Sequence, residues 1–164
     1  MRRCSLMLLA LLVLAGCEAA APKWVSPVAF DTTRAWIHVG NDSLPLLVEV
    51  AATEAQQTYG LMARPSLDPN SGMIFVYDSI RGGDLGFWMW RTRMPLDIAF
   101  LDSTGVIVRA LTMQPCPSDL YATSCDTYLP KAPYRSALEV NGGWLAEHGV
   151  REGARVTLEG GARN

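Results

Sequence analysis

Short runs of alternating hydrophobic and polar positions recur along most of this chain. The runs at residues 36–39 and 46–50 flank a Gly-Asn-Asp-Ser cluster and predict a β-hairpin. Residues 96–101 and 106–111 flank an Asp-Ser-Thr-Gly cluster and predict a second hairpin. By the same pattern, further strands are expected at residues 73–77, 86–90, 137–140 and 155–159.

Two segments have helical signals instead. Thr53 and Gln56 form a capping box, and the helix that they begin should end near residues 61–62, before Pro65. Residues 143–148 predict a second short helix. Many short strands with one or two short helices predict a mainly β fold, a β-sandwich or barrel with the helices packed on it, which is α+β by a loose count.

The N-terminal segment has the pattern of an export signal. Two arginines precede the apolar run at residues 6–14, which is too short to span a membrane because a spanning helix needs about 20 residues. Its end, Leu14-Ala15-Gly16-Cys17, resembles the bacterial lipobox, in which cleavage leaves Cys17 at the N-terminus with a lipid attached. The alternative is an ordinary signal peptide cut near Ala21.

The expected organisation follows from these patterns and from the length of 164 residues, which suits one ordinary domain. We expect a signal peptide at 1–16, a lipidated Cys17 and tether at 17–34, a single β-rich domain at 35–159 and a tail at 160–164. The protein should therefore be anchored in the cell envelope and face the periplasm. By resemblance to Gram-negative lipoproteins, Glu18 after the lipidated cysteine favours the outer membrane.

Composition excludes several classes of protein. Hydrophobic residues make up 49% and charged residues 18%, which is typical of a globular chain. The net charge of −2 leaves no basic surplus for nucleic acid, and no phosphate-binding glycine motif is present. With 2 His, 4 Cys and no Cys-x-x-Cys or Met-x-x-Met spacing, we expect neither a metal site nor a cofactor.

Cys116 and Cys125 are expected to form a disulfide. If Cys17 is acylated, these two are the cysteines that remain in the mature chain, and an exported protein enters an oxidising compartment. Closing this loop should contribute about 2.7 kcal/mol in the chain-entropy model.

Acidic residues within apolar strands are the first candidates for a site. Asp97 shares a strand face with Leu101, and burying a carboxylate there is costly without a cation. Arg64, after the first helix, is the partner that we expect for it. The pair is either a structural link or part of a ligand cleft. Glu139 lies in the same way within another strand, so Asp97 and Glu139 could also act as paired carboxylates.

Trp88 is the second kind of candidate. In the run 86–90, Trp88 and Trp90 share one face and Phe87 and Met89 the other. One face must belong to the core. The other is either covered by a helix or left as an aromatic platform that stacks on sugars or apolar groups.

A series of motifs resembles the prokaryotic domain-of-unknown-function family numbered 192. The motifs are Gly60-Leu61-Met62-Ala63-Arg64, Gly72-Met73-Ile74-Phe75, Phe87-Trp88-Met89, Thr92, Pro95-Leu96-Asp97-Ile98, Leu138-Glu139-Val140 with Gly143, and Gly149-Val150-x-x-Gly153-x-x-Val156. The resemblance covers roughly residues 46–159 and implies a compact β-rich fold, often exported, without an established activity. This chain has Arg91 where the family usually has Asn.

The sequence thus predicts a lipid-anchored envelope domain that is a binding or interaction module rather than an enzyme. Candidate ligand-binding residues are Arg64, Trp88, Asp97 and Glu139. Its expected partners are the membrane, through the lipid on Cys17, and a small molecule, glycan or envelope protein. The alternative is a carbohydrate or cell-wall hydrolase that uses Asp97 and Glu139.

Overall fold

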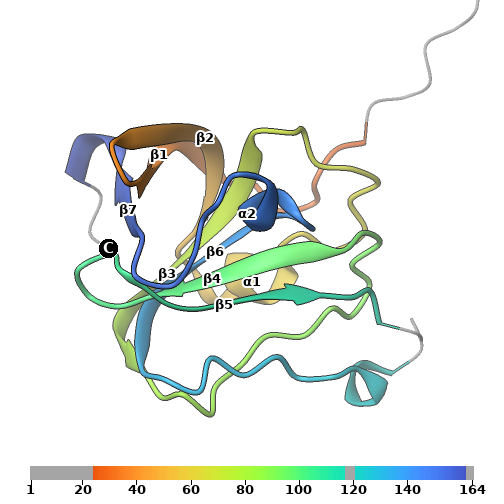
Figure 1. The fold of residues 1–164 in the computed structure, drawn as a ribbon. Coiled ribbons are helices and arrows are strands. Elements are labelled where there is room, and N and C mark those ends of the chain that lie inside the picture. Colours follow the sequence, from red (N-terminus) through yellow and green to blue (C-terminus); the bar gives the residue numbers. More distant parts are fainter. Residues whose placement is uncertain (1–23, 117–120, 162–164) are drawn as a thin grey trace, which may run out of the picture.

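One curled sheet carries the seven strands of this protein, in the order β5-β4-β6-β3-β2-β1-β7 (Figure 1). The structure is a computed structural model that describes residues 24–116 and 121–161. Its strands are β1 (Asp31–Val39), β2 (Asp42–Ala51), β3 (Ser71–Arg81), β4 (Leu96–Leu101), β5 (Ile107–Met113), β6 (Tyr134–Asn141) and β7 (Arg155–Leu158). Its helices are α1 (Glu54–Tyr59) and α2 (Trp144–Glu147), with short 3₁₀ turns at Ala122–Ser124 and Glu159–Gly161.

The predicted mainly β fold with two short helices is confirmed. Both predicted hairpins form, as β1–β2 and β4–β5, and each pairs in antiparallel register. The capping box at the start of α1 is present, since the Thr53 hydroxyl accepts from the Gln56 amide and the Gln56 side chain accepts from the Thr53 amide. Helix α1 is shorter than expected because the chain turns at Gly60, where φ is +51°.

Two segments differ from the sequence predictions. Strand β1 begins at Asp31, within the segment assigned to the tether. Residues 86–90 form no strand, apart from an isolated bridge between Phe87 and Tyr128. The alternation of their side chains nevertheless holds, because Met89 is buried and Trp88 is exposed. Local alternation thus oriented these side chains without a neighbouring strand to pair along the whole segment.

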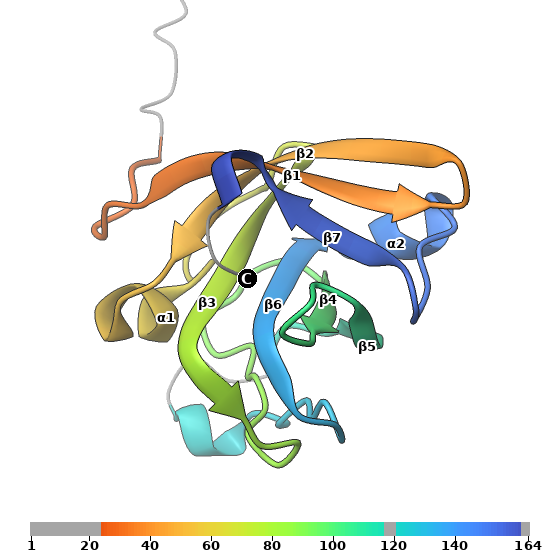
Figure 2. The same cartoon turned by 90° about the vertical axis from the view of Figure 1, so that its left-hand side faces the viewer.

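Helix α1 connects two parallel strands. Strands β2 and β3 pair in parallel, and such a pair needs a crossover connection instead of a tight turn. The crossover places α1 against one face of the sheet, beside the middle of β3, where the Gln57 side-chain amide donates to the Val76 carbonyl over 2.8 Å (Figure 2).

Hydrophobic residues fill both faces of the sheet. The inner face of the curl receives side chains from all seven strands, among them Ile37, Val48 and Ile74, and it also receives Trp144 and Leu145 of α2. The outer face carries a second cluster, to which β3, β4 and β6 contribute most, and Leu61 and Met89 from the connecting segments pack on it. Both faces of the central strands are therefore buried, which is why every residue of β4 is buried.

The two edges of the sheet meet at one place, where Val106 before β5 forms a bridge with Arg155 of β7. The Ile107 amide donates to the Ala154 carbonyl over 2.8 Å, and the Val156 amide donates to the Gly105 carbonyl over 2.8 Å. These bonds give the sheet the form of a half-barrel and enclose the inner cluster. Neither helix in the described part of the chain is long and apolar enough to span a membrane.

The disulfide between Cys116 and Cys125 is present, with its Cα atoms 5.2 Å apart. It closes a loop that leads from β5 toward β6. Neither cysteine belongs to the buried clusters on the two faces of the sheet, so the bridge constrains a surface connection.

Candidate functional site

Arg64 pairs with Glu49 of β2 and not with Asp97. Its Nη1 and Nη2 atoms donate to the two carboxylate oxygens of Glu49 over 2.9 and 2.7 Å, in the bidentate geometry of a strong ion pair. The guanidinium also lies 5.0 Å from the ring centre of Trp24. The predicted Arg64–Asp97 contact is wrong, because Arg64 meets the outer face of the sheet, where Glu49 points opposite to Val48.

Asp97 faces the inside of the curl and holds α2 in place. Its Oδ2 accepts from the backbone amide of Leu145 over 2.9 Å, and its Oδ1 accepts from the Thr112 hydroxyl over 2.7 Å. The cap residue of α2, Gly143, has no side chain to bond this amide, so Asp97 supplies the missing acceptor from β4. The buried carboxylate of Asp97 thus has two hydrogen-bond donors within the fold.

Glu139 is buried on the outer face. In the sheet it lies between Met73 of β3 and Ile98 of β4, both fully buried. Among the described residues it has no hydrogen bond or ion pair. Burial raises the pKa of its carboxyl from 4.5 to about 8. At neutral pH, Glu139 is therefore mostly a neutral carboxylic acid within an apolar layer.

The register of the sheet separates the two candidate acids. Asp97 is paired with Val140, whereas Glu139 is paired with Ile98, one position further along β4. Because adjacent positions of a strand point to opposite faces, the two carboxyl groups lie on opposite sides of the sheet. They share no cleft, and the paired-carboxylate mechanism has no geometric basis here.

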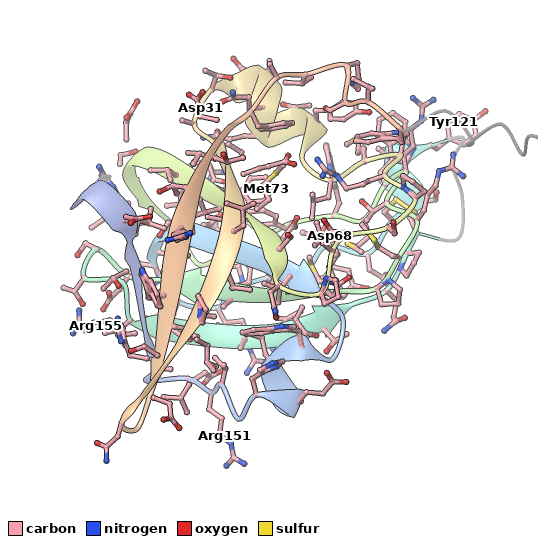
Figure 3. The ribbon with its side chains drawn as sticks, turned by 90° about the horizontal axis from the view of Figure 1, so that it is seen from above. Asp31, Asp68, Met73, Tyr121, Arg151 and Arg155 are labelled. Carbon is pink, nitrogen blue, oxygen red and sulfur yellow. A yellow bond between two sulfur atoms is a disulfide. The ribbon has the colours of Figure 1, made fainter. Side chains whose placement is uncertain are left out.

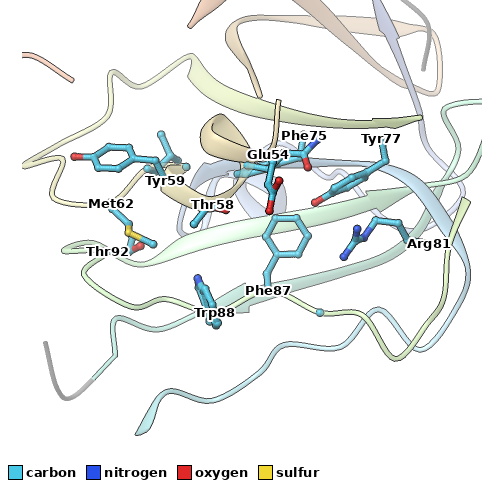
Figure 4. A pocket seen from close by; sticks show the side chains of 14 residues that line it. Glu54, Thr58, Tyr59, Met62, Phe75, Tyr77, Arg81, Phe87, Trp88 and Thr92 are labelled. Carbon is cyan, nitrogen blue, oxygen red and sulfur yellow. The ribbon is translucent and has the colours of Figure 1, made fainter. Parts of the chain in front are cut away.

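Trp88 lies at an open cavity beside α1. Its side chain is 49% exposed at the rim of a cavity of about 250 Å³, hereafter the Trp88 cavity. Side chains from α1, from the end of β3 and from the segment 86–92 surround it (Figure 4). They are Glu54, Gln57, Thr58, Tyr59, Leu61, Met62, Phe75, Tyr77, Arg81, Phe87, Trp88 and Thr92, and Gly60 and Gly86 complete the lining.

Aromatic rings stacked edge to face form the floor of this cavity. The Phe75 and Phe87 ring centres are 4.9 Å apart at 89°, and Phe87 packs on Phe100 of β4 in the same manner. These contacts anchor Phe87 in the outer core. Trp88, the next residue, therefore has its backbone held against a rigid layer while its indole faces solvent.

Arg81 brings a positive charge to the cavity in a fixed orientation. Its Nε donates to the Tyr134 hydroxyl over 3.0 Å, and its guanidinium lies 4.3 Å from the ring centre of Tyr77. The Tyr134 hydroxyl in turn donates to the Leu85 carbonyl over 2.8 Å. Burial raises the pKa of both tyrosines, so they stay protonated and act as neutral supports for the guanidinium.

A second cavity lies on the other side of α1. It measures about 550 Å³, is mainly apolar, and shares Glu54, Thr58, Tyr59 and Met62 with the first. Its remaining lining residues are Val28, Ala55, Ala63, Trp90 and Arg91, and we call it the Trp90 cavity. Both open beside α1, so the two cavities flank this helix.

The backbone of the Trp90 cavity has two residues in the left-handed region. Ala63 and Arg91 have φ angles of +57° and +56°, and the Ala63 amide donates to the Arg91 carbonyl over 2.8 Å. Asn adopts this conformation more readily than most residues, so the Asn that the resemblance implies at the position of Arg91 would suit this backbone. Here the Arg91 guanidinium instead lies 4.5 Å from the ring centre of Trp90.

The four residues singled out from the sequence therefore do not meet in one place. Trp88 lines the Trp88 cavity, Arg64 lines a separate cavity of about 330 Å³ next to Trp24, and Asp97 borders another beside α2. Glu139 lines none of these cavities. Sequence reasoning missed Arg81, Tyr77 and Glu54. Tyr77 continues the alternation of Met73 and Phe75, a signal that was available, but the irregular pairing between Val76 and Arg81 hid the position of Arg81.

Two further expectations concern residues and groups outside these cavities. Cys17, the expected lipidation site, lies outside the described residues. Within residues 24–116 and 121–161, no three His, Cys, Asp or Glu side chains gather in a way that could hold a metal ion.

Comparisons with known proteins agree with the fold. The family model of DUF192, described as Uncharacterized ACR, matches residues 36–158. A crystal structure from Sinorhizobium meliloti 1021, of a protein described as a candidate transcription regulator, is 27% identical with a TM-score of 0.69 and covers 81% of this chain and 98% of its own. A protein of unknown function from Novosphingobium aromaticivorans DSM 12444 is 28% identical with a TM-score of 0.68 and covers 87% and 99%. No curated protein matches the chain significantly.

Proposed function

Starting from the DUF192 family, to which this chain belongs, we propose that the protein is a glycan-binding domain of the cell envelope, anchored to the membrane through a lipid on Cys17. The sugar occupies the Trp88 cavity. The observation that carries this proposal is the half-exposed indole of Trp88 beside an aromatic cavity that also presents polar side chains.

The shape and lining of the cavity suit one sugar ring. A volume of about 250 Å³ is below the range of about 300–1,000 Å³ that is typical of drug-sized ligands, so the occupant is small. The faces of Trp88 and Phe87 offer apolar contact to the C–H side of a ring. Thr58 and Glu54 offer oxygens that accept hydrogen bonds from sugar hydroxyls, and Thr58 can also donate.

The membrane anchor rests on the sequence. The lipobox pattern at Leu14-Ala15-Gly16-Cys17 supports acylation, and the Cys116–Cys125 disulfide supports passage into an oxidising compartment. A domain held in the periplasm by a lipid encounters the glycans of the envelope directly. We assign it to the outer membrane, because Glu18 follows the lipidated cysteine.

Membrane attachment is tested with the full chain expressed with its signal peptide. Wild-type protein should fractionate with outer-membrane vesicles and incorporate labelled palmitate, whereas Cys17→Ser should do neither. Unchanged fractionation of Cys17→Ser would contradict the anchor. Cys116→Ser serves as the control, because it should stay with the membrane.

Glycan binding is tested with the soluble domain by titration calorimetry against galactotriose, chitotriose and trigalacturonate. At least one of these should bind saturably, and Trp88→Ala should weaken that binding at least about tenfold, which corresponds to about 1.4 kcal/mol of lost contact. Tyr121→Ala, which changes a 69% exposed aromatic that does not line the cavity, should leave the affinity unchanged. Absence of binding to all three sugars, or equal affinity of Trp88→Ala, would refute the function.

A further inference from the structure

The guanidinium of Arg81 is held in place at Nε, whereas its two terminal nitrogens have no hydrogen-bond partner among the described residues. Only Nε has a partner among the described residues, namely the Tyr134 hydroxyl at 3.0 Å. Neither Nη1 nor Nη2 takes part in a hydrogen bond or ion pair there. Stacking on Tyr77 at 4.3 Å fixes the plane of the group.

Arg64, on the same outer face, shows the opposite arrangement. Both of its terminal nitrogens are occupied by the Glu49 carboxylate. Arg81 has no such counter-ion, because the described ion pairs of this protein are Arg64–Glu49 and Arg109–Glu152. A preorganised guanidinium with two free donors at a cavity wall is a receptor for a planar, bidentate anion.

We propose that the Trp88 cavity selects sugars that carry a carboxylate, such as uronic acids, and that Arg81 binds this carboxylate through Nη1 and Nη2. The inference rests on the glycan-binding function proposed above and narrows its ligand class. Figure 4 shows the guanidinium of Arg81 and the indole of Trp88 on either side of Phe87. A ring stacked near Trp88 can therefore direct a substituent across Phe87 toward Arg81.

Glu54 determines the orientation of the sugar in the cavity. Its carboxylate points into the cavity beside Phe87 from the first turn of α1 (Figure 4). This negative group repels a second carboxylate and accepts bonds from hydroxyls. A singly charged ring thus places its acid toward Arg81 and its hydroxyl edge toward Glu54. Glu139 adds little negative charge near the cavity at neutral pH, because burial raises its pKa to about 8.

The test compares trigalacturonate with galactotriose, two trisaccharides that differ only in the carboxylate or CH₂OH group of each ring. Wild-type domain should bind trigalacturonate about 10- to 100-fold more tightly than galactotriose, because charged hydrogen bonds of this kind contribute about 1.5–3 kcal/mol. Arg81→Gln should abolish this preference, and a far-ultraviolet circular dichroism spectrum that matches wild type shows that the variant is folded. Arg81→Lys keeps the positive charge but cannot bind a carboxylate through two nitrogens, so it should retain only part of the preference.

Arg151→Gln is the matched control. Arg151 is exposed, and it lies on the opposite side of the molecule from α1 (Figure 3). The variant removes the same charge and should keep the full preference, so a general electrostatic effect is distinguished from a local one. If Arg81→Gln does not fold, the wild-type preference and the Arg81→Lys variant decide the question.

Different binding results would overturn the carboxylate preference and the glycan-binding function. Equal wild-type affinity for the two sugars, with binding still dependent on Trp88, overturns the carboxylate preference and leaves the glycan function standing. A preference that persists in Arg81→Gln also overturns it, and a preference that falls equally in Arg151→Gln shows a general charge effect and overturns it too. Lack of binding to either trisaccharide and to chitotriose overturns both proposals together.

Discussion

Replacing Glu139 by Gln should stabilise this protein at alkaline pH and have little effect at acidic pH. The side chain is only 4% exposed and has no hydrogen bond or ion pair among the described residues. Burial alone raises the pKa of its carboxyl from 4.5 to about 8. Gln has the same shape and cannot ionise, so the variant isolates the cost of charging this site.

The size of the expected loss of stability with rising pH follows from proton linkage. Below pH 4.5 the carboxyl is protonated in both the folded and the unfolded chain, and its full contribution to stability is present. Between pH 4.5 and about 8 the unfolded chain releases the proton and the folded chain retains it, so stability falls as pH rises, by about 1.4 kcal/mol per pH unit. Across the window the loss reaches at most about 5 kcal/mol, and above it the difference is constant.

Urea unfolding at a series of pH values between 4.5 and 9 measures this loss, with tryptophan fluorescence as the signal. The free energies of unfolding of wild type and Glu139→Gln should diverge steadily up to pH 8, with the variant more stable. Glu147→Gln, which changes an exposed acid on α2, should differ from wild type by a constant amount. Parallel profiles for wild type and Glu139→Gln would show that the carboxyl is already ionised and hydrated in the fold, and the burial argument would be refuted.

Three other predictions test contacts within the fold. Reduction of Cys116–Cys125 should lower the free energy of unfolding by about 2.7 kcal/mol and leave the far-ultraviolet circular dichroism unchanged, because the bridge lies outside both cores. A double-mutant cycle with Arg64→Met and Glu49→Gln should give a coupling of about 1–3 kcal/mol, since the pair is bidentate and partly buried; additive effects would contradict the ion pair. Asp97→Ala should cost at least about 1–3 kcal/mol and speed hydrogen exchange of the α2 amide that Asp97 caps, and unchanged exchange would contradict that role.

Alternation along the sequence was a reliable guide to the direction in which side chains point. It placed Leu96, Ile98 and Phe100 on one face of β4 and Ala99 and Leu101 on the other, as they are found in the outer and inner clusters. The rule holds because successive side chains of an extended chain point to opposite sides, whichever strand lies next to it. The same rule separated Trp88 from Met89 in a segment that forms no strand.

Short sequence motifs also predicted where a helix begins. The capping box at Thr53 and Gln56 depends on two side chains three residues apart, so it can be recognised without knowledge of the fold. The resemblance carried by the ordered motifs likewise identified the family, whose model matches residues 36–158.

The partners of charged residues could not be deduced in this way. Arg64 was expected to meet Asp97, yet it meets Glu49, and Asp97 caps α2. The identity of a partner depends on which strands are neighbours and in what register. Here β4 and β6 are paired so that Asp97 and Glu139 face opposite sides.

The sequence by itself determined the fold class and the direction of side chains along each strand, because each depends on residues close together in the chain. Only the tertiary structure decided that Arg81, Tyr77, Glu54 and Trp88 share one cavity. These residues come from α1, from β3 and from the segment that follows it, and the crossover between β2 and β3 brings α1 over the outer face. Non-local packing, which no periodicity encodes, therefore created the candidate site.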